Sequence, residues 1–227
     1  EWQTLRTPLE PGELALAELL DDSLPEGWTI AVQAQLWNAR PDVVAYNPDA
    51  GVGVFEVKDW DPSAREFKYS SRKDALLARP GKGEKWYVAQ NPVGQAIGYR
   101  ETMQSAFFGD EPARRFVTAS VVMTNFPAEH ELLGALKRMV KTYDKEHKET
   151  FRLIGMESLR NGHVEDIFPQ AFTPVLQTRI EPRTQGRIES LLTEQENSAQ
   201  QRDPIVLDSE KRELIANPIR RRRVCGP

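Results

Sequence analysis

Apolar and polar residues alternate along the chain with two different periods, and the change of period predicts where helices give way to strands. Residues 11–20 carry apolar side chains at helical spacing, which predicts a first helix. Three runs typical of strands follow at 29–36, 42–46 and 52–57. The Asn-Pro-Asp-Ala-Gly segment at 47–51 has the composition of a turn, so the last two runs form a predicted hairpin.

The rest of the chain continues the alternation. Pro92 opens a predicted helix that runs through Phe107, and the almost wholly apolar run at 116–124 predicts a buried strand. The shorter predicted elements are a helix at 129–143, a strand at 151–154 and an amphipathic helix at 186–197. Helices and strands in this order favour an α/β protein whose sheet is flanked by helices.

The stretch from residue 61 to residue 90 differs in composition from its surroundings. It carries seven Lys and Arg against four Asp and Glu, a net charge of +3 in a chain whose total is −4. Tyr69, Trp86 and Tyr87 are interleaved with the basic residues. Two interpretations stay open: a clamp on a nucleic-acid backbone, or a solvated, mobile hairpin. As nucleic-acid contacts, the residues to test first are Arg72, Lys73 and Lys85.

Composition limits the class of protein. The chain has 227 residues, 39% hydrophobic and 28% charged, which suits one large globular domain or one domain with a tail. No apolar stretch reaches the roughly 20 residues of a membrane-spanning helix, and a basic-then-apolar signal peptide is not visible. The single cysteine, Cys225, excludes an intramolecular disulfide and a thiolate zinc site. We therefore expect a cytoplasmic protein with no membrane partner.

The pattern that points to chemistry is Asp42 followed by Glu56 and Lys58. Glu56 and Lys58 are two residues apart and project from one face of a strand, and Asp42 begins the partner strand of the hairpin. Two adjacent carboxylates favour a bound Mg²⁺, and a lysine beside them can orient an attacking water. These residue types suit phosphodiester hydrolysis. The alternative is a weak ion pair on a solvated sheet face.

Residues 40–42 (Arg-Pro-Asp) and 56–58 (Glu-Val-Lys) together resemble the PD-(D/E)xK nuclease pattern. Residues 51–60 are similar to the core of the nuclease-related domain, the NERD domain. Gly-Glu at 12–13 and Asn-Pro at 91–92, the latter followed by a glutamine, resemble that family's flanking elements in the same order. The resemblance implies a restriction-endonuclease-like fold, a mixed central sheet flanked by helices with an αβββαβ core.

The resemblance also implies roles for individual residues. Asp42 and Glu56 would ligate Mg²⁺ or Mn²⁺ with the main-chain carbonyl of Val57, and Lys58 would position or activate the water. Glu13 would be an auxiliary acid, acting on the metal through water or completing a second metal site. Its alternative is a solvated helix residue.

Gln95 would lie at the edge of the same site and contact the lysine, water or the substrate phosphate. Its alternative is a hydrogen bond at the start of a helix.

The C-terminal segment carries a second resemblance. Residues 207–215, the arginines at 220–223 and the final Gly-Pro are similar to the lead-in to the phosphate loop of a superfamily 1 helicase. No Walker lysine is present, so we expect no ATP site within this chain and a helicase domain in cis. The alternative is a basic tail that binds nucleic acid non-specifically. The predicted organisation is a nuclease domain at 1–180, a helix and polar linker at 181–204, and the helicase lead-in at 205–227.

The function predicted from the sequence is that of a magnesium-dependent deoxyribonuclease, the nuclease module of a nuclease–helicase acting in DNA repair or anti-phage defence. Two alternatives remain. One is a catalytically weak DNA-binding module that guides an attached helicase, and the other is a ribonuclease on the same scaffold.

Overall fold

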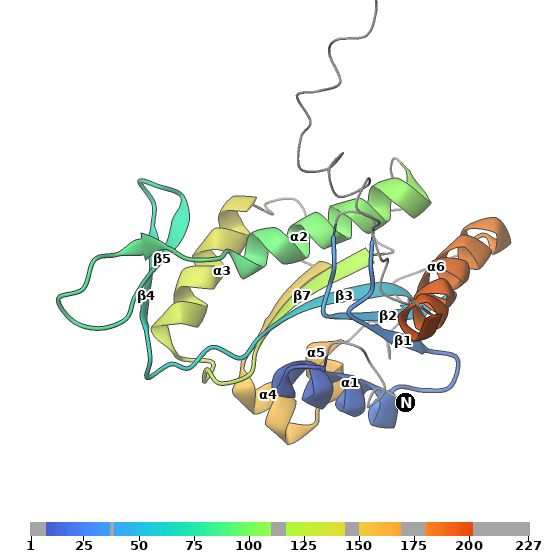
Figure 1. Cartoon of the computed structure of the whole chain (residues 1–227), viewed down its shortest axis with the longest axis horizontal. Coiled ribbons are helices and arrows are strands. Elements are labelled where there is room, and N and C mark those ends of the chain that lie inside the picture. The colour runs from blue at the N-terminus through green and yellow to red at the C-terminus, as the bar shows by residue number, and fades with distance from the viewer. Residues whose placement is uncertain (1–7, 37–38, 110–116, 144–149, 169–179, 202–227) are drawn as a thin grey trace, which may run out of the picture.

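A five-stranded mixed sheet forms the centre of the protein, in the order β1-β2-β3-β7-β8 (Figure 1). We describe it from a computed structural model, which covers residues 8–36, 39–109, 117–143, 150–168 and 180–201. The strands are β1 (Thr29–Val32), β2 (Val43–Asn47), β3 (Gly51–Lys58), β7 (Val117–Met123) and β8 (Phe151–Ile154). β1, β2 and β3 pair antiparallel, whereas β3, β7 and β8 pair parallel.

Helices cover both faces of this sheet (Figure 1). One face carries α2 (Pro92–Met103) and α3 (Glu131–Tyr143). The other carries α1 (Pro11–Ser23), α4 (Met156–Asn161) and α5 (Val164–Ile167). The order α1, β1, β2, β3, α2, β7 is the αβββαβ order expected from the sequence, so the restriction-endonuclease-like fold class is confirmed.

The central strand β3 is buried from both sides. Val52 and Val54 belong to the apolar cluster under α2 and α3, while Phe55 and Val57 belong to the cluster under α1. The parallel neighbour β7 is buried along its whole length. Parallel strands covered on both faces form continuous apolar runs, which is the pattern that predicted this strand at 116–124.

A second, three-stranded antiparallel sheet lies between β3 and α2 in sequence and at one end of the molecule (Figure 1). It contains β4 (Glu66–Ser70), β5 (Ala75–Arg79) and β6 (Tyr87–Val88). The ring of Phe67 stacks on Trp60 at 5.1 Å, and β4 packs against α3. The basic stretch is therefore a small packed sheet and not the solvated hairpin that was one of its two interpretations.

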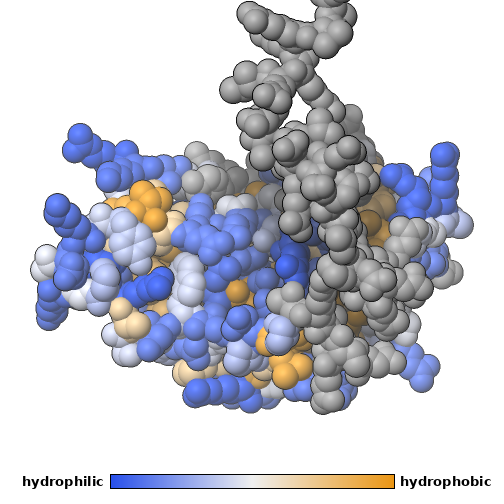
Figure 2. Space-filling view, viewed as in Figure 1, coloured by the Kyte–Doolittle hydropathy of each residue, from blue (hydrophilic) through white to orange (hydrophobic). Residues whose placement is uncertain are grey.

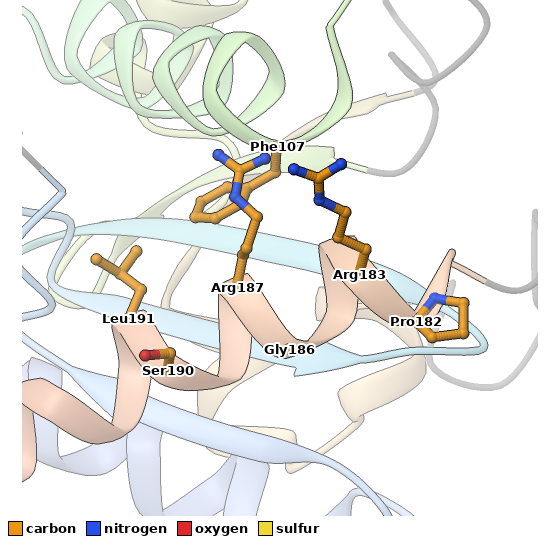
Figure 3. Close-up of a pocket in the computed structure, with 7 residues that line it drawn as sticks. All are labelled: Phe107, Pro182, Arg183, Gly186, Arg187, Ser190 and Leu191. Carbon is orange, nitrogen blue, oxygen red and sulfur yellow. The ribbon is translucent and has the colours of Figure 1, made fainter.

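The last described helix, α6 (Pro182–Gln201), packs against a single π-helical turn, η2 (Gln104–Phe108), that extends α2. The guanidinium of Arg187 lies over the ring of Phe107 at 5.3 Å and donates to the Ala106 carbonyl at 2.9 Å. A groove of about 550 Å³ runs along this contact (Figure 3). It is lined by Phe107, Pro182, Arg183, Gly186, Arg187, Ser190 and Leu191. This groove lies at the end of α2 remote from the predicted catalytic residues.

Two predicted boundaries were wrong. The strand expected at 29–36 ends at Val32, because Gln33 has φ +51° and turns the chain out of the sheet. The helix expected through Phe107 is present, as an α-helix to Met103 and a π-helical turn to Phe108. α6 extends to Gln201, into the segment expected to be a linker, since the Gln and Ala residues there are good helix formers.

The rest of the predicted linker and the helicase lead-in at 205–227 lie outside the described residues. Within the described part of the chain, no helix combines the length and the apolar character required to cross a membrane.

Gly53 on β3 supplies a test of the packing. A Cβ added there would lie 2.6 and 2.8 Å from ring atoms of Phe168. That ring is fully buried between Trp28 and Phe55, so it has little room to move. We expect Gly53→Ala to lower the free energy of unfolding by roughly 1–3 kcal/mol in a urea titration.

The matched control is Gly98→Ala on α2. A Cβ there meets no atom within 4 Å, and Ala is a better helix former than Gly by up to about 1 kcal/mol. Unchanged stability in Gly53→Ala would contradict the described packing of β3.

Candidate active site

Three predicted catalytic residues meet where the antiparallel pairing of β2 and β3 begins. Asp42 immediately precedes β2, and its main-chain N–H donates to the carbonyl of Phe55 at 3.1 Å. Its side-chain Oδ2 accepts a hydrogen bond from the N–H of Val57 at 2.6 Å. The pairing register therefore sets the Asp42 carboxylate beside the segment that carries Glu56 and Lys58, as the hairpin prediction required.

Glu56 is only 1% exposed, because it projects from the central strand beneath α2. Its Oε1 forms an ion pair with Nζ of Lys58. Its Oε2 is buried and has no hydrogen-bond partner of normal geometry among the described residues. Burial raises the pKa of Glu56 above its ordinary value of 4.5, although the charge and hydrogen bond of Lys58 oppose the rise. This is not the solvated ion pair that was the alternative to a catalytic site.

Asp42 shares this crowded environment. Burial raises its pKa from 3.8 to about 7, and the negative charges of Glu56 and Glu13 add to the rise. The hydrogen bond from Val57 and the positive charge of Lys58 lower it by less. The site thus brings together more carboxylates than the single positive charge of Lys58 can compensate.

Glu13 on α1 is 8% exposed, so the alternative of a solvated helix residue was wrong. Its Oε2 accepts from Nε2 of Gln33 at 2.9 Å and from the N–H of Glu10 at 3.3 Å. Oε1 of Gln33 in turn accepts from Nη2 of Arg40. Gln33 therefore links Glu13 to Arg40, which lies two residues before Asp42.

The start of α1 is tied directly to the end of β3. The N–H of Gly12 donates to Oδ2 of Asp59 at 2.7 Å, and the hydroxyl of Thr124 donates to Oδ1 of the same carboxylate. A Cβ on Gly12 would collide with that carboxylate, so this close approach requires glycine. The contact holds Glu13, the next residue, at the catalytic edge of the sheet.

Gln95 reaches the site from the first turns of α2. The helix-start hydrogen bond proposed as its alternative is made by Asn91 instead, whose side chain accepts from Gly94 N at 3.1 Å. Gln95 hydrogen-bonds Tyr99, and its Oε1 is buried without a partner. The hydroxyl of Tyr99 acts on Glu56 as a hydrogen-bond donor and lowers the carboxyl pKa. Burial, followed by the charge of Glu56, raises the pKa of Tyr99 itself.

Sequence analysis missed three residues of this site. Tyr99 follows Gln95 by four positions, so helical spacing alone could have placed the two together. Asp59 lies inside the segment that resembles the family core, but nothing local shows that it caps a helix 47 residues away. Nothing in the sequence indicated the contact of Gln33 with Glu13, because that contact depends on a left-handed backbone conformation at Gln33.

The predicted nucleic-acid contacts are exposed but do not converge. Arg72 and Lys73 lie in the turn that joins β4 to β5, and Lys85 lies in the loop between β5 and β6. Because the strands are antiparallel, these two loops lie at opposite ends of the second sheet. The structure therefore does not gather the three residues into one patch.

A hard divalent cation fits the donor chemistry at Asp42 and Glu56. Both are oxygen donors, one has a buried oxygen without a partner, and their mutual repulsion would be relieved by positive charge. Among the described residues, no group of three or more His, Cys, Asp or Glu side chains is arranged to hold a metal ion. A cation here would depend on the two carboxylates, the Val57 carbonyl and water.

Comparison with known proteins gives one family and one structural likeness. No curated protein matches the chain. A crystal structure of a repair endonuclease from Pyrococcus abyssi aligns with a TM-score of 0.35 and 14% identity, covering 66% of this chain. The chain spans about half of that protein, 48% of its length.

The family match is to the nuclease-related domain, over residues 9–124. It covers just over half of the chain and contains Glu13, Asp42, Glu56, Lys58 and Gln95. On this match, the chain belongs to the nuclease-related domain (NERD) family.

Proposed function

We propose that this protein is a metal-dependent nuclease that hydrolyses phosphodiester bonds in DNA. The observation that carries the proposal is the convergence of Asp42, Glu56 and Lys58, in which a buried carboxylate oxygen is left without a partner. A buried charge with an unused acceptor is unfavourable unless a ligand completes it. Membership of the nuclease-related domain family supports the same reaction class.

Asp42 and Glu56, with the carbonyl of Val57, would hold Mg²⁺ or Mn²⁺, which supplies Lewis-acid polarisation of the phosphate and a more acidic bound water. Lys58 holds its ammonium beside Glu56 and can donate to the attacking water or to a phosphate oxygen as negative charge develops there. Tyr99 fixes the Glu56 carboxylate from the side of α2.

Glu13 would not contact the reacting atoms directly. Its carboxylate is oriented by Gln33, and it adds negative charge beside Asp42. That charge favours cation binding at the neighbouring carboxylates and would allow contact with the cation through water.

The helicase domain in cis and a role in repair or defence remain predictions from the sequence. They depend on residues 205–227, which lie outside the described part of the chain.

The first test is cleavage of linear duplex, circular and single-stranded DNA, and of RNA, with Mg²⁺, Mn²⁺ or EDTA. We expect cutting of DNA that requires the metal, and we expect Lys58→Ala to reduce the rate roughly 100- to 1,000-fold because transition-state charge loses its donor. Lys137→Ala, an exposed lysine on α3, is the control and should cut normally. Equal rates in Lys58→Ala and the unmodified protein would refute the proposed role of this lysine.

A second test uses stability and does not depend on turnover. Because the pKa of Asp42 is raised from 3.8 to about 7 in the fold, its contribution to stability is complete below about pH 4 and is lost as pH rises through 7. Asp42→Asn removes that charge permanently. In EDTA at about pH 8, we expect this variant to melt roughly 2–6 °C above the unmodified protein, and at about pH 4 the two should coincide.

Millimolar Mg²⁺ should then raise the Tm of the unmodified protein at about pH 8 but not that of Asp42→Asn. Asp21→Asn, an exposed acid on α1, controls for removal of one negative charge. If Mg²⁺ stabilised Asp42→Asn as strongly as the unmodified protein, the cation would bind elsewhere.

A further inference from the structure

The second sheet is inserted between the two elements that carry the catalytic residues. The chain leaves β3 directly after Lys58, forms β4, β5 and β6, and enters α2 a few residues before Gln95. Trp60, two residues beyond Lys58, stacks on Phe67 and fixes the first connection against the apolar core. The second sheet therefore lies at the end of the molecule where β3 ends and α2 begins (Figure 1).

The two faces of the second sheet differ in character. The inner face packs into the core through Phe67, Leu76 and Ala78, all buried. The register places Glu66 opposite Arg79 and Lys68 opposite Leu77, so these four positions share the outer face. The outer face is therefore largely charged, and it is the side that the core leaves open.

An aromatic ring is held among the outer cations. Nζ of Lys68 lies 4.0 Å from the ring centroid of Trp86, and the guanidinium carbon of Arg79 lies 4.6 Å from it. Arg79 also pairs with Glu66 at 2.5 Å, which neutralises the acid on this face. Lys68 and Arg79 therefore place positive charge over the ring of a half-buried indole, which holds the two cations in position.

The edge strand β6 adds exposed apolar surface. Tyr87 is 42% exposed and Val88 is 62% exposed, and the only comparable described residue is Leu14 at 36% on α1. Hydrophobic side chains reach the surface among hydrophilic ones at this end of the molecule (Figure 2). The register places Val88 on the outer face, opposite Leu77, and Tyr87 on the other face, opposite Ala78, so apolar surface is exposed on both sides of this edge strand.

The distribution of net charge along the chain indicates which kind of partner this sheet binds. Residues 61–90 carry a net +3, so the remainder of the chain carries −7, since the total is −4. By net charge, residues 61–90 attract a polyanion more strongly than the remainder of the chain does. Phosphates alone would gain nothing from the exposed side chains of Tyr87 and Val88, and duplex bases are already stacked on one another. Unpaired bases use both the charges and the exposed rings.

We propose that Trp86, Tyr87 and Val88 together with Lys68 and Arg79, here named the β6 platform, bind an unpaired segment of nucleic acid next to the cleavage site. The proposal rests on the nuclease function and narrows its substrate class to nucleic acids with a single-stranded portion. Tyr87 stacks on a base at the exposed edge strand, and Lys68 and Arg79, which lie over the Trp86 ring, contact phosphates.

The experiment measures binding without cleavage. Fluorescence anisotropy in EDTA, with Lys58→Ala in every protein, compares a labelled single-stranded oligonucleotide with a duplex of equal length. We expect Trp86→Ala and Tyr87→Ala each to weaken single-strand binding roughly 5- to 100-fold and to change duplex binding by less than about twofold. Lys68→Gln should weaken binding and reduce the slope of log affinity against log salt by about one.

Two variants keep the result interpretable. Leu14→Ala removes an exposed apolar side chain from another element and should change nothing. Trp86→Phe keeps an aromatic ring for the two cations and should retain most of the affinity, which separates loss of the ring contacts from loss of folding. Tyr87 is exposed, so its variant tests the proposal even if Trp86→Ala unfolds.

Unchanged single-strand affinity in Tyr87→Ala, or in a folded Trp86→Ala, would overturn the platform, as would an equal loss of affinity for the duplex. The nuclease proposal fails separately, if the protein with intact Lys58 cuts no substrate in the presence of metal. Cutting without a platform effect, or a platform effect without cutting, identifies which of the two proposals is wrong.

Discussion

The burial of Glu56 is the constraint around which the rest of the site is arranged. Helices cover β3 on both faces, and the carboxylate of Glu56 near the end of this strand is therefore buried. Lys58 and Tyr99 supply partial compensation, one through charge and one through a hydrogen bond. Among the described residues, Oε2 of Glu56 has no hydrogen-bond partner of normal geometry, a position that a cation would fit.

At Asp42 and Glu56, the burial and repulsion that favour cation binding therefore lower the stability of the fold. The apolar clusters on the two faces of the sheet hold the carboxylates together in spite of their repulsion. The contact of Gly12 and Thr124 with Asp59 serves the same end, because it ties α1 to the strands whose ends form the site. Strain at Gln33 is part of this arrangement, since its side chain orients Glu13.

The second sheet is built into the chain between the two elements that carry the proposed catalytic residues. A packed insertion anchored by Trp60 and Phe67 presents its charged face in a defined orientation, which a flexible loop would not do. Its position between β3 and α2 would connect a ligand on that face to the segments that carry Lys58 and Gln95.

The sequence by itself determined the order of the core elements and the convergence of Asp42, Glu56 and Lys58. Period-two and helical patterns depend only on which face of a local element is apolar, so the strands at β2, β3 and β7 were predicted closely. Asp42, Glu56 and Lys58 were predicted because they belong to one hairpin, where pairing follows from short-range geometry.

Tertiary structure decided what depends on contacts between distant segments. The Asp59 cap on α1, the bridge from Gln33 to Glu13, and the burial of Glu13 have no local signature. The basic stretch shows the same limit: its composition indicated nucleic acid, yet only strand pairing separated Arg72 from Lys85 and brought Lys68 and Arg79 to Trp86. The physical reason is that composition records which charges and rings are present, while the register of a sheet decides which of them share a face.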